Sequence, residues 1–174
     1  MKNLIIIILF VHSYILSAQT TLEKAVLTEL NIYRKSHNLP SATLDLQVSK
    51  AAKYHTSWMV KSGLCSHFEN VDVPGFTEID GPEERGKHFG ILNDIISFSE
   101  ICNFSRSNDA SSPIVERPLS DVELAKDIIK RFYTSPEHNE TMIQEINKGS
   151  ILQVGIGVIV YNGMSYTTIY FVEK

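Results

Sequence analysis

The chain ends in LQVGIGVIVYNGMSYTTIYFVEK, residues 152–174, and this stretch decides the fold. Apolar, β-branched and aromatic residues dominate residues 152–161 and 165–172, which is typical of strands. Asn162-Gly163 lies between them, and this dipeptide favours the tight turn of an antiparallel hairpin. Helical patterns come earlier in the chain and the hairpin comes last. This order predicts an α+β fold rather than alternating strand–helix–strand units.

Three amphipathic helices are predicted before the hairpin. Their N-terminal caps are Thr20, Asp45 and Ser120, and the first and third caps are each followed three residues later by a Glu, as in a capping box. The predicted ends are before Asn38-Leu39-Pro40, at Gly63 and at Ser135-Pro136. Shorter helices are predicted around residues 83–88 and after Pro136 as far as Ile146.

The segment between the second and third helices has three parts. Residues 64–90 contain several Gly and Pro residues, which predicts irregular structure. Residues 92–102 are predicted to be extended, with Ile96, Phe98, Glu100 and Cys102 on one buried face. Residues 103–119 are rich in Ser, Asn and Pro, which predicts an exposed loop.

Residues 1–18 have the pattern of a secretory signal peptide. Lys2 precedes an apolar run, and the small Ala18 precedes the predicted cleavage point. The alternative is a membrane anchor, but the run is shorter than the roughly 20 residues that span a bilayer. No later segment is long and apolar enough to span. The remaining chain, residues 19–174, is predicted to form a single domain.

The net charge and the number of cysteines limit the classes of function that the sequence allows. The formal net charge is −4 and no basic run occurs, so nucleic-acid binding is not favoured. The chain has two cysteines, Cys65 and Cys102, and an even count in an exported protein predicts one disulfide. The alternative is a pair of buried free thiols.

Each cysteine lies two residues from a side chain that could transfer protons or bind a metal. The two stretches are Cys65-Ser66-His67 and Glu100-Ile101-Cys102. In extended chain, residues two apart point to the same side. A Cys65–Cys102 disulfide would therefore hold His67 beside Glu100.

His138, which follows the third helix, is the other candidate. His67, Glu100 and His138 together could form an acid/base site or hold a divalent metal such as zinc. Each also has a structural interpretation: His67 as a surface histidine, Glu100 as the partner of a backbone amide or of Arg85, and His138 as a helix cap. His55 lies on the apolar stripe of the second helix, which favours a core histidine hydrogen-bonded to a neighbour.

The succession of these motifs resembles the CAP superfamily, which groups cysteine-rich secretory proteins, insect antigen 5 and plant pathogenesis-related proteins. The resemblance is closest to the bacterial secreted branch. The matching segments are Leu30-Asn31-Ile32-Tyr33-Arg34, Asn38-Leu39-Pro40, Leu44-Asp45, Ala51-Ala52 through His55 to Met59, Ser66-His67, Arg85 with Gly90, Ser99-Glu100-Ile101, Phe132 with Ser135-Pro136 and His138, and Val154-Gly155-Ile156-Gly157-Val158.

The resemblance implies a three-layer α-β-α sandwich with a central antiparallel sheet and an open cleft. It implies that His67, Glu100 and His138 line this cleft, while a fourth position, a second Glu in animal members, is unassigned. The chain departs from the family pattern at Ile101 for Asn, Phe132 for Trp, Glu137 for Gly and Asn139 for a basic residue.

The resemblance implies lipid, glycan or protein ligands in different members, without a shared reaction. We therefore favour a secreted binding module over catalysis. The alternative is a hydrolase in which His67, Glu100 and His138 move protons or hold a metal that activates water. A third interpretation is a structural or host-interaction protein whose cleft is vestigial.

Overall fold

The computed structural model describes residues 19–106 and 119–174. The predicted signal peptide and residues 107–118 of the predicted loop lie outside the described residues. The elements, in chain order, are α1 (Thr21–Ser36), β1 (Thr43–Leu44), α2 (Leu46–Ser62), α3 (Pro82–His88), β2 (Ser97–Arg106), α4 (Asp121–Tyr133), α5 (Pro136–Met142), β3 (Leu152–Tyr161) and β4 (Met164–Glu173).

The long helices begin where the sequence predicts. Thr20 and Ser120 each accept a hydrogen bond from the backbone three residues on and complete capping boxes at α1 and α4. Asp45 caps α2, which ends at Gly63 in the left-handed conformation (φ 72°). Only the helix after Pro136 differs in extent, because it ends at Met142 rather than near Ile146.

The sheet has the strand order β1-β3-β4-β2, with β1 parallel to β3 and the other pairs antiparallel. The predicted hairpin is confirmed, since Tyr161 pairs with Met164 across the turn. Asn162 and Gly163 adopt φ values of 49° and 72°, as the tight hairpin turn requires.

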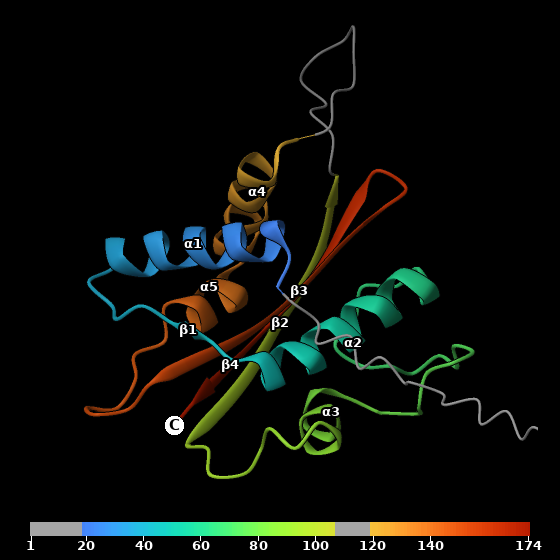
Figure 1. Cartoon of the computed structure of the whole chain (residues 1–174), viewed down its shortest axis with the longest axis horizontal. Helices are drawn as coiled ribbons and strands as arrows, with labels where there is room; N and C mark the ends of the chain where they lie inside the picture. The colour runs from blue at the N-terminus through green and yellow to red at the C-terminus, as the bar shows by residue number, and fades with distance from the viewer. Residues whose placement is uncertain (1–18, 107–118) are drawn as a thin grey trace, which may run out of the picture.

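Helices cover both faces of this sheet, as Figure 1 shows: α1, α4 and α5 on one side and α2 and α3 on the other. The first side holds the larger core, which includes Val26, Leu30, Ile128, Phe132, Ile156 and Ile169. The second side packs Val48, Ala51 and Ala52 against Tyr170 and Val172. The α+β, three-layer prediction is therefore confirmed.

The predicted bounds of β2 were wrong at both ends. The strand begins at Ser97, so Ile96 lies outside it and is 57% exposed, not buried. It continues to Arg106, into residues predicted to form a loop. The reason is pairing with β4 along its whole length, which lets buried Ser105 hydrogen-bond to Ser165 at 2.8 Å.

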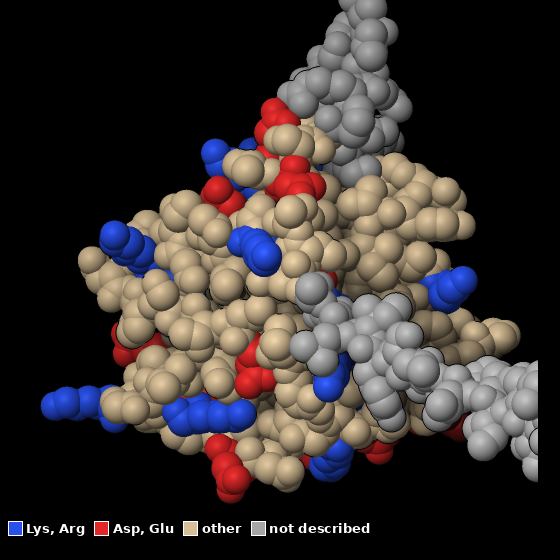
Figure 2. Space-filling view, viewed as in Figure 1, with Lys and Arg blue, Asp and Glu red and all other residues tan. Residues whose placement is uncertain are grey.

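Acidic and basic side chains are interspersed over the face of the molecule shown in Figure 2, with uncharged surface between them. Within the described parts of the chain, no helix combines the length and apolarity needed to cross a bilayer.

Candidate functional site

His67 and Glu100 form the centre of the candidate site. His67 lies in the irregular segment after α2, and Glu100 projects from β2 on the side of the sheet that α2 covers. The His67 Nδ1 atom lies 2.9 Å from Glu100 Oε1, within hydrogen-bonding distance. The side chain of His67 is 39% exposed, whereas that of Glu100 is 1% exposed. A buried carboxylate thus orients an imidazole whose other edge reaches the surface.

His138 joins this pair from the first turn of α5. Its ring lies 6.3 Å, centroid to centroid, from the ring of His67, in an edge-on arrangement. The ring of Phe132 packs edge-on against it at 5.3 Å, at the position where the resemblance to the CAP superfamily implies Trp. The structure therefore brings the three predicted site residues together from three separate segments. We call His67, Glu100 and His138 the cleft residues below.

Arg85 of α3 is a second partner of the Glu100 carboxylate. The guanidinium is fully buried, and its Nη2 atom donates to Glu100 Oε2 at 2.9 Å and to the carbonyl of His67 at 3.1 Å. It also donates to the hydroxyl of Tyr170 and to Glu69. Arg85 therefore ties β2, β4 and the His67 segment together, and it is the partner that the structural interpretation of Glu100 anticipated.

Glu69 is the site residue that sequence reasoning missed. Its side chain is 2% exposed, and Oε1 accepts from Arg85 and lies 2.8 Å from His55 Nδ1. His55 is thus a buried histidine with a hydrogen-bonded neighbour, as predicted. The spacing from His67 to Glu69 is the same two-residue step that singled out Cys65. Counting the same step onward from His67 leads to Glu69, so this signal was present in the sequence.

Burial and neighbouring charges shift the pKa values of the three cleft residues in different directions. Burial opposes ionisation of Glu100, but the hydrogen bond from His67 and the charges of His55 and Arg85 outweigh it and lower its pKa. The hydrogen bond to Glu100 raises the pKa of His67. Burial, and then the charge of His67, lower the pKa of His138. His67 therefore keeps its proton to a higher pH than the neighbouring His138 does.

Cys65 and Cys102 lie beside the cleft residues as free thiols, one exposed and one buried. The Cys102 Sγ atom is 3.8 Å from His67 Nδ1. A hydrogen bond between the two thiols lowers the pKa of Cys65, and the same contact together with burial raises that of Cys102.

One group of side chains in the described ranges could hold a metal ion: His55, Glu100 and Cys102. The three potential ligand atoms lie within 4.8 Å of one another. The group fits a metal chemically, because nitrogen, oxygen and sulfur donors all suit zinc and because His55 Nε2 is buried without a hydrogen-bond partner. It shares only Glu100 with the predicted ligand set of His67, Glu100 and His138. In that set, His67 contacts a carboxylate through Nδ1, and a histidine that binds a metal through one ring nitrogen usually makes such a contact through the other.

Comparison with known proteins places this architecture in a family. The profile of the cysteine-rich secretory protein family, CAP, matches residues 27–173. No curated protein sequence gives a significant match.

Two solved structures share the fold. One is an extracellular protein containing an SCP domain from Bacillus anthracis, with a TM-score of 0.55 and 20% identity over 87% of this chain; the match spans 40% of that protein. The other is an outer surface protein of Borrelia burgdorferi, with a TM-score of 0.59 and 16% identity, covering 87% of this chain and 91% of that one. With the profile match over nearly the whole described chain, these findings establish that the protein belongs to the CAP family of cysteine-rich secretory proteins.

Proposed function

We propose that this protein is a secreted, single-domain binding module whose cleft residues take a lipid, glycan or protein ligand outside the cell. The observation that carries the proposal is the His67–Glu100 pair, in which a buried carboxylate fixes a half-exposed imidazole. The rigid sheet orients the imidazole in advance, so a ligand does not have to order it on binding. Export through a signal peptide at residues 1–18 agrees with the extracellular and outer-surface relatives.

A metal-assisted or acid/base hydrolase is the second candidate, favoured by the opposite pKa shifts of the two histidines. His138, with a lowered pKa, would accept a proton, and His67, with a raised pKa, would donate one. Zinc is the cofactor proposed for this reaction. It would supply a more acidic bound water, and the cleft residues would hold it; the His55–Glu100–Cys102 group could hold it only in protein whose Cys102 is a free thiol.

Titration of the histidines by NMR tests whether the cleft residues act as a unit. In the unaltered protein we expect the pKa of His67 to lie above, and that of His138 below, the ordinary histidine value. Glu100→Gln removes the negative charge from the carboxyl group, so the pKa of His67 should fall. Exposed His37, at the end of α1, is the internal reference, and its ring signals should be unaffected by the Glu100→Gln change.

The same spectra separate the two candidate functions. A binding module should show shifts of the His67 and His138 ring protons with one of three probes: a long-chain fatty acid, an oligosaccharide or a peptide. A zinc site should stop the ligating histidines from titrating, because metal-bound imidazole stays neutral until acid displaces the metal. If the pKa of His67 is the same in Glu100→Gln as in the unaltered protein, and if neither the probes nor zinc shift the ring signals of His67 or His138, the cleft residues have only a structural role.

We also propose that Cys65 and Cys102 form a disulfide in the exported protein. The Cys102 thiol lies beside His67, and the two thiols are close enough to shift each other's pKa values. The purified, oxidised protein should contain no thiol that reacts with a thiol reagent after unfolding, and its mass should be lower by two hydrogen atoms than that of the reduced protein. Two reactive thiols per chain would contradict the disulfide.

A further inference from the structure

A large cavity lies beside Glu69, and its lining is acidic. Its volume is about 700 Å³, within the usual range of small-molecule pockets. Five of its eleven lining residues are carboxylates, and none is Lys or Arg; the five are Glu69, Asp72, Glu78, Asp80 and Glu84. We call this space the acidic cavity. None of the cleft residues lines it.

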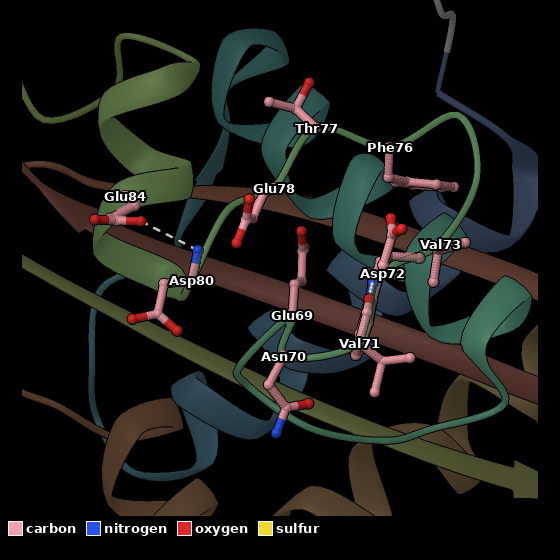
Figure 3. A pocket seen from close by; sticks show the side chains of 11 residues that line it. Glu69, Asn70, Val71, Asp72, Val73, Phe76, Thr77, Glu78, Asp80 and Glu84 are labelled. Atoms are coloured by element: carbon pink, nitrogen blue, oxygen red, sulfur yellow. Dashed lines mark hydrogen bonds between the residues drawn. The ribbon is translucent and has the colours of Figure 1, made fainter.

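Glu69 is the buried member of this set and has an unsatisfied oxygen. The residue is 6% exposed, and its Oε1 atom already contacts Arg85 and His55. Its Oε2 atom is buried and has no hydrogen-bond partner. A buried acceptor without a donor is costly, and native proteins seldom leave one unpaired. Figure 3 shows the Glu69 side chain pointing into the cavity, toward Glu78 and Thr77.

The positive charge nearby does not neutralise the acidic cavity. Arg85 pairs with Glu69, but it pairs equally with Glu100 on its other side, so one cation serves two carboxylates. Asp72, Glu78 and Asp80 are exposed around the cavity. Like charges so close together attract a compensating cation.

The size and walls of the cavity indicate an organic cation rather than a single metal ion. Calcium is held by six to eight oxygens at about 2.3–2.6 Å, which is far tighter than a space of about 700 Å³. Part of the wall is aromatic or apolar, formed by Trp58, Phe76 and Val73. The Trp58 indole N–H is already donated to the carbonyl of Val71 at 3.3 Å, so these walls offer contact area rather than donors. A cation with a methylene chain suits both features.

We propose that the acidic cavity binds an organic polycation, with one ammonium or guanidinium group donating to Glu69 Oε2 and a second held by the exposed carboxylates. The same chemistry occurs in a free polyamine and in a basic peptide segment. The inference goes beyond the binding function proposed for the cleft residues, because it concerns a second site that shares no side chain with them. The test of this second site is therefore independent of the test of the cleft residues.

Calorimetric titration of the full chain with spermidine tests the site, with a capped Lys-Ala-Arg peptide as a second arm. Spermidine binding with one site per chain supports the free polyamine, and tighter binding of the peptide assigns a peptide source. Glu69→Gln should weaken binding about tenfold or more, the size of one lost charge-assisted hydrogen bond. Because that change also touches Arg85, exposed Glu78→Gln is the second variant and should weaken binding severalfold without disturbing the fold.

Glu83→Gln is the matched control, since Glu83 is exposed, lies next to Glu84 in α3 and does not line the cavity. It removes the same charge and should leave the affinity within about twofold, the residual effect of one screened surface charge. Equal weakening by Glu78→Gln and Glu83→Gln would show general counterion attraction and overturn the site. Absence of binding by both probes would do the same and would leave Glu69 Oε2 to an ordered water.

Discussion

Replacing Arg85 with methionine should lower the free energy of unfolding by about 3–5 kcal/mol, the usual cost of removing one partner from a buried ion pair. Methionine keeps most of the volume of the side chain, so the change tests charge and hydrogen bonding rather than packing. Without the guanidinium, Glu69 and Glu100 would remain buried with His55, His67 and the Tyr170 hydroxyl as partners, none of which carries a permanent positive charge. Burial disfavours the charged form of Arg85, but its pKa is nevertheless raised, because Glu100, Tyr170 and Glu69 outweigh that penalty.

Urea unfolding measures this effect, with the midpoint and the slope fitted together. Arg131→Met is the matched control, because Arg131 forms a 2.8 Å ion pair with Asp127 on the exposed side of α4. Exposed pairs of this kind contribute about 0–1 kcal/mol. If both variants lose the same small amount, Arg85 is not the centre of a buried network.

The Arg85→Met substitution should also alter the geometry of the cleft residues. Arg85 donates to the backbone carbonyl of His67 as well as to the carboxylate of Glu100, so it fixes both members of the pair. Under conditions where Arg85→Met remains folded, the ring signals of His67 should move while those of exposed His37 stay unchanged. The stability of the fold and the geometry of the candidate site therefore depend on one side chain.

The features that the sequence predicts correctly are those set by neighbours in the chain. Asn162-Gly163 forces the hairpin because both residues adopt positive φ values there. Thr20 and Ser120 begin their helices through contacts three residues away. Such local rules do not need the rest of the molecule.

Long-range pairing explains where sequence reasoning failed. The composition of residues 103–106 is that of a loop, yet β4 supplies a paired neighbour for each of them. Glu69 lies in a segment without periodicity, and only its return toward α3 brings it to Arg85. The convergence of His67, Glu100 and His138 was anticipated from the resemblance to the CAP family and from the strand pattern around Glu100, because residue spacing alone cannot place α5 beside β2.

Gly155→Ala should lower the free energy of unfolding by about 3 kcal/mol, the upper end of the usual cost of overpacking. Gly155 lies on β3, opposite Tyr170 of β4, and faces α2. A Cβ atom at this position would lie 2.2 Å from the carbonyl carbon of Val48 and 2.5 Å from the amide nitrogen of Ser49. Both are backbone atoms, so no side chain can rotate away, and helix and strand must separate.

The second glycine of β3 gives a graded comparison. A Cβ atom on Gly157 would lie 2.7 Å from the backbone of Ala52, so Gly157→Ala should destabilise the fold less than Gly155→Ala. Val160→Ala is the control on the same strand, because Val160 is 49% exposed and should lose no more than about 0.5 kcal/mol. Thermal and urea unfolding of the three variants give the order directly. A Gly155→Ala protein as stable as the control would mean that α2 does not lie this close to the sheet.

The close approach at Gly155 also determines where His55 lies. His55 belongs to α2, and its two ring nitrogens face Glu69 at 2.8 Å and Glu100 at 4.0 Å. When an added methyl group lifts α2 from β3, these distances must increase, while Arg85, which belongs to α3, keeps its own contacts. Folded Gly155→Ala should therefore show displaced ring signals for His55 in NMR spectra, whereas those of exposed His37 should stay where they are. The glycines of the Val-Gly-Ile-Gly-Val strand thus serve both the packing of α2 and the position of His55 beside the candidate site.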